Sequence, residues 1–96
     1  MNMKSHMECP VAKTALLLSD TWTMLIIRDL LNKQMRFCEI EQSLEGISSR
    51  TLTLKLKQLE SEKIIVKNDL YYTLSKQGQK LKNVIAAMEA WGKNIK

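Results

Sequence analysis

The spacing of apolar residues along the chain predicts a mostly helical domain. Apolar positions recur every three or four residues, the period at which side chains share one face of an α-helix. This pattern predicts helices that begin at Pro10 and cover residues 22–33, 36–44 and 48–62, with a long last helix after Ser75. The stretch WTMLIIRDLLNK is apolar nearly all round, which predicts that it lies at the centre of the core. Proline suits the first position of a helix, and Ser19-Asp20-Thr21 offers a turn and an N-cap before the second helix.

Two segments depart from the helical period. IIVK and LYYTL are rich in β-branched and aromatic residues and flank Asn68-Asp69, so they predict a hairpin with a tight turn. Gly46 ends the third helix, and Ser48 or Ser49 caps the fourth, which together predict a helix-turn-helix. A hairpin directly after it gives the winged version. We therefore expect a mainly α fold with a small β-hairpin, a winged helix-turn-helix.

Length and composition limit the organisation of the chain. The 96 residues suit one small domain, which we assign to residues 9–96, and we interpret residues 1–8 as a disordered or cloning-derived tail. A content of 45% hydrophobic and 26% charged residues is typical of soluble globular proteins. We see no apolar run long enough for a membrane span, no signal peptide and only two cysteines, so we expect a cytoplasmic protein.

The available chemistry argues against catalysis. No nucleophile–base pair, carboxylate pair, phosphate-binding glycine loop or set of metal ligands is apparent, and the single histidine, His6, lies in the tail. We therefore predict that the protein is not an enzyme and needs no cofactor or metal. The net charge of +5 favours a polyanionic partner. Residues 47–82 hold eight Lys or Arg against three Asp or Glu, which favours DNA over the rival interpretation, a winged helix that only assembles with other proteins.

The predicted helix over residues 48–62 carries the main binding hypothesis. Leu52, Leu56 and Leu59 share its buried face. The candidate DNA contacts lie at its start or on the other faces: Ser48, Ser49, Arg50, Thr51, Thr53, Leu54, Lys55 and Lys57. Residues near the start of such a helix reach base edges in the major groove.

Each side chain type in this set has its own chemistry. Arg50 can pair with both acceptors of a guanine edge, and the threonines can meet a base or a phosphate. Lys55 and Lys57 would bind phosphates, which position a protein without reading sequence. Leu54 can contact only an apolar group, and in the major groove that group is the thymine methyl. The serines are the least diagnostic, because capping alone explains them.

Several segments resemble one known family. CPVAKTALLLSDTWTMLIIRDLL, RFCEIEQSLEGISSRTLTLKLKQLE and AAMEAWGKNI are similar to the HxlR-type transcriptional regulators, and the likeness spans residues 9–95. The shared motifs are an N-terminal Cys-Pro, a Trp-Thr before an Ile/Leu-rich helix, Arg-Phe-x-Glu, Gly-Ile-Ser and Ala-Trp-Gly. The resemblance implies a homodimer that binds a pseudo-palindromic double-stranded DNA operator, with Arg36 among its DNA contacts. It also implies dimerisation through the first and last helices, with Val84, Met88 and Trp91 at the interface.

Three departures from the family pattern change the expectations. Ser19-Asp20-Thr21 stands where the family usually has Gly-Gly-Lys, which removes one cation. Leu54 stands where a glutamine or similar polar residue is common. The wing shrinks to a minimal hairpin in which Lys67 is the cation left near the tip, so we expect weak or absent wing contacts with DNA.

The cysteines and tryptophans suggest possible signals. In some members of the family the N-terminal cysteine senses oxidants or electrophiles, and the resemblance gives Cys9 this possibility; a helix N-terminus also favours the reactive thiolate. The alternative is that Cys9 only caps or packs. We expect Cys38 to be buried as a small hydrophobic residue. A small-molecule ligand in a pocket lined by Trp22 and Trp91 is a further alternative, although aromatic residues at helical spacing more often belong to a core.

Overall fold

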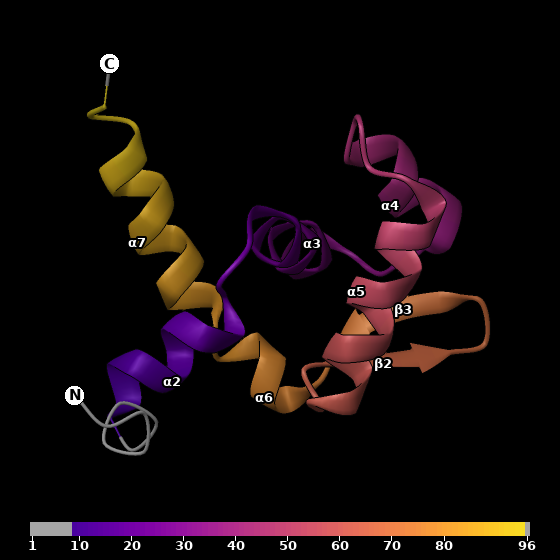
Figure 1. Cartoon of the computed structure of the whole chain (residues 1–96), viewed down its shortest axis with the longest axis horizontal. Helices are drawn as coiled ribbons and strands as arrows, with labels where there is room; N and C mark the ends of the chain where they lie inside the picture. The colour runs from indigo at the N-terminus through magenta and orange to yellow at the C-terminus, as the bar shows by residue number, and fades with distance from the viewer. Residues whose placement is uncertain (1–8, 96) are drawn as a thin grey trace.

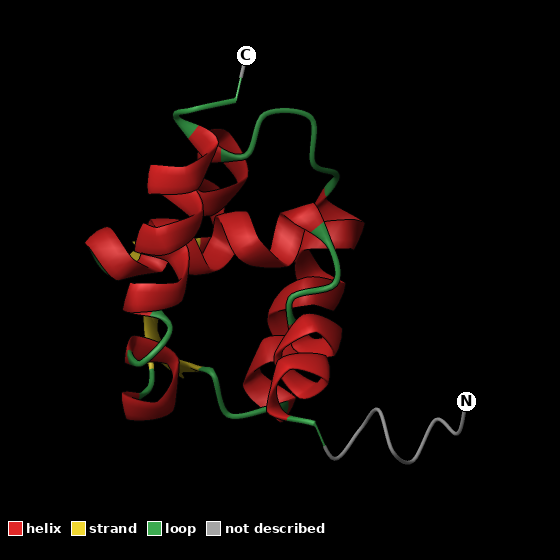
Figure 2. Cartoon of the chain, turned by 90° about the vertical axis from the view of Figure 1, so that its left-hand side faces the viewer, coloured by secondary structure: helices red, strands yellow, loops and turns green. Residues whose placement is uncertain are grey.

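The computed structural model describes residues 9–95. The expected tail at residues 1–8, with His6, lies outside the described residues. Helices make up most of the molecule, and the short strands lie partly hidden behind them (Figure 2). Within the described part of the chain, no helix is long and apolar enough to cross a membrane.

The first two helices begin where local signals predict. Helix α2 (Pro10–Leu17) has proline at its first position. Helix α3 (Thr21–Asn32) is capped by Asp20, whose Oδ1 accepts a hydrogen bond from the Thr23 amide at 2.8 Å. Ile26 and Ile27 of α3 are completely buried, which confirms the prediction that this helix lies in the core.

Helices α4 (Phe37–Ser43) and α5 (Ser49–Ser61) form the helix-turn-helix. Gly46 lies in the turn between them with φ +94°, a conformation that glycine adopts at little cost. Ser48 caps α5, and its Oγ accepts a hydrogen bond from the Thr51 amide at 3.0 Å. The predicted positions of the turn and the cap are therefore confirmed.

The sheet has one strand more than the sequence pattern indicated. Strand β1 (Met35–Arg36) pairs with β3 (Tyr71–Leu74), which also pairs with β2 (Ile65–Asn68), so the antiparallel order is β1-β3-β2. The expectation that residue 36 starts a helix was wrong, because its backbone lies opposite Tyr71 in the sheet. The hairpin is confirmed, but its turn is one residue later than expected. Asn68 is paired with Tyr71, and Asp69, at φ 59°, and Leu70 form the loop.

The expected long last helix is broken in two. Ser75 caps a short helix, α6 (Lys76–Gln79), and α7 (Lys82–Gly92) follows. Between them the amides of Lys80 and Leu81 bond to carbonyls three residues back instead of four. Gly78 is buried so tightly against the Ile64 carbonyl that α6 is held on the sheet, and the chain turns there before α7 leaves the core.

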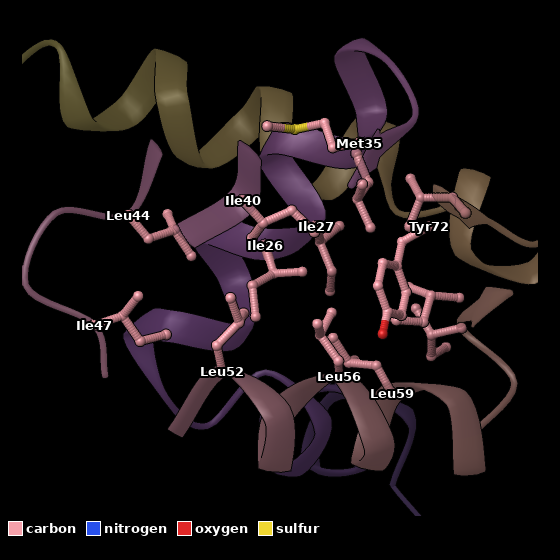
Figure 3. Packing of buried hydrophobic residues seen from close by; sticks show 14 of the residues in the cluster. Ile26, Ile27, Met35, Ile40, Leu44, Ile47, Leu52, Leu56, Leu59 and Tyr72 are labelled. Atoms are coloured by element: carbon pink, nitrogen blue, oxygen red, sulfur yellow. The ribbon is translucent and has the colours of Figure 1, made fainter. Parts of the chain in front are cut away.

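The core lies between α3, α5 and the sheet. Figure 3 shows Leu52, Leu56 and Leu59 of α5 pointing toward Ile26 and Tyr72, and all three leucines are buried. This packing fixes the rotation of α5 about its axis. The four-helix order with a hairpin directly after α5 makes the fold a winged helix-turn-helix. Figure 1 shows α2 and α7 at one end of the longest axis and the β2–β3 hairpin at the other.

Candidate nucleic-acid interface

The outer face of α5 is exposed and basic. Because Leu52, Leu56 and Leu59 are buried, Arg50, Leu54 and Lys57 point to solvent, and Leu54 is 58% exposed. The predicted division of this helix into a buried and an exposed face is confirmed. An exposed leucine between two cations is a surface that can meet both the charged and the apolar parts of a DNA groove.

The hydroxyl groups at the start of α5 already have partners. Ser48 Oγ donates to Thr51 Oγ1 at 2.9 Å, and Ser49 Oγ donates to the carboxylate of Glu41 in α4. Thr53 Oγ1 donates to the Ser49 carbonyl at 2.8 Å. Thr51 therefore keeps its own hydroxyl hydrogen for a further acceptor, whereas the other three hydroxyls are best suited to accept. The serines hold the turn together, and a DNA role for any of the four stays a prediction.

Lys55 differs from the other cations of α5. Its Nζ lies 2.9 Å from Asp20 Oδ2 at the start of α3, and only 25% of its side chain is exposed. Partial burial by itself raises the pKa of the Asp20 carboxyl. The hydrogen bonds from Lys55 and Thr23 outweigh this effect and lower the pKa below its ordinary value. Asp20 is therefore a carboxylate that neutralises Lys55.

Two more predicted DNA contacts lie on the sheet. The Arg36 guanidinium is 5.5 Å from the centre of the Tyr71 ring, and Lys67 Nζ is 5.5 Å from the centre of the Tyr72 ring. These cation–π contacts hold both charges beside the hairpin. The hairpin loop itself presents Asp69 and Leu70, so its tip has no cation of its own.

Sequence reasoning did not find every residue that organises this interface. The sequence pattern identified Asp20 only as an N-cap. It did not predict the ion pair with Lys55, because the two residues are 35 positions apart. Tyr71 had a signal only as a strand residue. Its place under Arg36 follows from the β1–β3 pairing, which no local pattern indicated.

The opposite end of the molecule exposes apolar side chains. The apolar residues of α7 include Val84, Met88 and Trp91. Val84 is half-buried against the core, whereas Met88 and Trp91, farther along the helix, are 45% and 71% exposed. Val11 of α2 is 76% exposed. An apolar groove of about 430 Å³ runs between α2, α3 and α7 and is lined by Val11, Leu18, Met24 and Met88, among others. Figure 1 shows α2 and α7 at the same end of the molecule, remote from the hairpin.

The two tryptophans and the two cysteines lie at different places in the fold. Trp22 packs against the core, whereas Trp91 is exposed on α7, so the two differ in their surroundings. Cys9 is exposed at the N-cap of α2 and makes no side-chain capping bond. Cys38 is also exposed, which overturns the expectation of burial: its side chain lies outside the core, in a groove with Arg36 and Lys67.

Known proteins share this fold and sequence pattern. The HxlR-like helix-turn-helix family model matches residues 17–96. An uncharacterised helix-turn-helix transcriptional regulator, sll1512 of Synechocystis, is 35% identical over 88% of this chain and 67% of its own length. The transcriptional regulator YodB of Bacillus subtilis is 35% identical over 86% of this chain and 81% of its own length.

Solved structures agree with this result. The quinone-bound form of YodB superposes with a TM-score of 0.83, at 34% identity over 91% of this chain and all of that chain. The oxidised form of the redox regulator HypR superposes with a TM-score of 0.84, at 25% identity over 92% of this chain and 98% of that chain. The chain therefore belongs to the HxlR-like helix-turn-helix family of transcriptional regulators.

Proposed function

We propose that this regulator is a homodimer that binds a pseudo-palindromic DNA operator with α5 in the major groove. The observation that carries the proposal is the exposed basic face of α5, held outward by its buried leucines. The second helix of a helix-turn-helix enters the major groove and presents its first turns to the bases. Arg50, Leu54 and Lys57 are the side chains that this pose aims at DNA.

The three side chains have different tasks in this proposal. Arg50 binds a guanine through its O6 and N7 acceptors, and Leu54 packs on a thymine methyl. Lys57 binds a phosphate and fixes the register without reading sequence. Arg36 adds a cation from the sheet. The wing contributes little, because its loop holds Asp69 and Leu70 and its nearest cation, Lys67, lies against Tyr72.

The apolar end of the molecule supports a dimer. Val11, Met88 and Trp91 are exposed there, and an aromatic residue with its apolar neighbours is typical of the centre of an interface. A two-fold dimer through α2 and α7 leaves α5 of each protomer free. We expect the two copies of α5 to bind half-sites that are one turn of the DNA helix apart, about 34–36 Å.

Selection of bound sequences from random DNA, at two salt concentrations, tests the proposal. We expect a pseudo-palindrome, and binding that weakens with salt at a log–log slope of about −0.9 per phosphate contact. In the Arg50→Gln variant, the preference for guanine at one position should relax by about 1–3 kcal/mol. If no DNA is enriched and retention ignores salt, the chain is instead a protein–protein assembly module.

We further propose that Cys9 makes operator binding responsive to oxidants. Its thiol is exposed at the N-terminus of α2 and makes no side-chain capping bond, so an oxidant can reach it from solvent. The quinone-bound form of YodB and the oxidised form of HypR are relatives whose names describe such chemistry. This similarity supports the proposal.

Diamide treatment tests this role, since diamide takes two hydrogens from two thiols and leaves a disulfide. We expect diamide to change the operator affinity of the wild-type protein and not that of the Cys9→Ser variant. Cys38→Ser identifies the thiol that pairs with Cys9, because Cys38 is the other exposed thiol. A response that persists in this variant means a disulfide between the Cys9 residues of two protomers, and a lost response means a Cys9–Cys38 disulfide. Identical responses of the wild-type and Cys9→Ser proteins would remove the sensing role.

A further inference from the structure

One ion pair connects α5, the helix proposed to enter the major groove, to the start of α3, the helix at the centre of the core. Lys55 Nζ of α5 lies 2.9 Å from Asp20 Oδ2 at the start of α3. The other ion pairs in the described part of the chain join neighbours within one helix or at its end, Arg28 with Asp29 and Lys93 with Glu89. This pair is therefore a tertiary contact, between residues 35 positions apart.

Two hydrogen bonds that do not involve Lys55 fix the Asp20 carboxylate. Its Oδ1 accepts from the Thr23 amide at 2.8 Å, and its Oδ2 accepts from Thr23 Oγ1 at 2.9 Å. These bonds fix the carboxylate on the first turn of α3, and the buried Ile26 and Ile27 fix α3 in the core. A carboxylate anchored in this way is a fixed point against which α5 can be set.

Lys55 and Lys57 are therefore not equivalent cations. Lys57 is exposed and makes no ion pair with any of the described residues, whereas the Lys55 side chain is only 25% exposed and its charge is neutralised by Asp20. A phosphate would have to displace Asp20 from Lys55, but it would only have to displace water from Lys57. A phosphate neutralised by Lys57 therefore releases about one condensed counterion from the DNA. A phosphate that meets Lys55 releases much less, because Asp20 already balances the charge of that lysine.

On the basis of the proposed function, we infer that Asp20 and Lys55 are positioning residues that set the angle of α5 for the DNA groove. Lys55 is then not a phosphate contact, in contrast to the expectation from sequence. The pair acts through Arg50 and Leu54, whose distance from the base edges depends on how α5 sits on α3. Misplaced base contacts reduce binding to the operator, and binding to non-cognate DNA is unaffected because it depends on phosphates.

The test compares the full-length wild-type protein with Lys55→Gln, Lys55→Arg, Asp20→Asn and the double variant Asp20→Asn/Lys55→Gln. Asparagine is as good an N-cap as aspartate, so Asp20→Asn removes the ion pair and keeps the cap. Lys57→Gln is the matched control, the same change two residues away on the same helix. For each protein, affinity for the selected operator and for non-cognate DNA is measured across a range of salt concentrations.

We expect Lys57→Gln to reduce the salt slope by about 0.9 and to weaken both kinds of DNA equally. Lys55→Gln should leave the salt slope unchanged and lower the ratio of operator to non-cognate affinity about fivefold, which is about 1 kcal/mol. Asp20→Asn leaves Lys55 as an unpaired cation, so it should raise the affinity for both kinds of DNA and still lower their ratio by a similar factor. The double variant keeps the net charge of the wild type and should lower the ratio no further than Lys55→Gln does, because both changes break one contact. Lys55→Arg, which can keep the pair, should retain the ratio of the wild type.

Other results would overturn the inference. If Lys55→Gln reduces the salt slope as much as Lys57→Gln does, Lys55 is a phosphate contact. If the single variants lose only thermal stability and keep the operator ratio, the pair is merely structural. If the wild-type protein binds no DNA, the proposed function fails together with the positioning role, an outcome distinct from the two in which only this inference fails.

Discussion

Replacing Trp91 with alanine should dissociate the dimer. The side chain is 71% exposed in the isolated protomer, so nearly all of its contribution to stability would come from contact with a second copy. An aromatic side chain buries about 150–250 Å² in all, so covering the exposed part hides roughly 100–180 Å². At about 25 cal/mol per Å², this amounts to roughly 2.5–4.5 kcal/mol for each tryptophan.

A two-fold interface contains the residue twice, but part of the gain is offset by incomplete burial and by the cost of ordering side chains. We therefore expect at least about 3 kcal/mol for the dimer, a rise in the dimer dissociation constant of more than about 100-fold. Sedimentation velocity over a dilution series measures that constant. The far-UV circular dichroism spectrum of the variant should match the wild-type spectrum, because Trp91 packs little within its own protomer.

Leu54→Ala is the control for this experiment. Leu54 is also an exposed large apolar residue, 58% exposed, but it lies on the outer face of α5 and not on α2 or α7. Its removal should leave the dissociation constant unchanged. A Trp91→Ala protein that dimerises as tightly as the wild type would refute the assignment of α7 to the interface. A wild-type protein that stays monomeric at tens of micromolar would refute the dimer itself.

Four further substitutions test the structural reasoning. Leu54→Gln should change the preferred base at one A·T position by about 1 kcal/mol or more, and an unchanged selected operator would show that Leu54 does not touch the bases. Gly78→Ala places a Cβ 2.2 Å from the Ile64 carbonyl oxygen, so urea titration should show a loss of about 1–3 kcal/mol in unfolding free energy. Gly92→Ala, whose Cβ meets nothing within 4 Å, should cost little, and equal losses would contradict the packing argument. The lowered pKa of Asp20 stabilises the fold fully above the ordinary carboxyl pKa of about 3.9, and this contribution is lost as pH falls through the lower folded value. Asp20→Asn should therefore lose less unfolding free energy than the wild type on acidification below about pH 4, and parallel pH profiles would contradict this.

Much of the fold was predictable because its signals are local. Pro10, Asp20 and Ser48 mark helix starts through their own backbone geometry or through bonds to amides three residues ahead. Gly46 marks the turn, and the spacing of leucines in α5 marks its buried face. These features depend only on neighbours within one or two turns of the chain, so the sequence by itself determined the helix-turn-helix and the face of α5 that points outward.

Contacts between distant residues decided the rest. Strand β1 is two residues long and exists because Tyr71 and Tyr72 pair with it. The last helix breaks where Gly78 meets the Ile64 carbonyl, a contact with a residue outside the helix that no local pattern indicated. Lys55 has the sequence context of a DNA contact, yet Asp20 pairs with it once α3 and α5 pack together. Local hydrogen bonds and helical periodicity can be recognised in a linear pattern, but a free cation and a neutralised one can be told apart only after the core has brought their neighbours together.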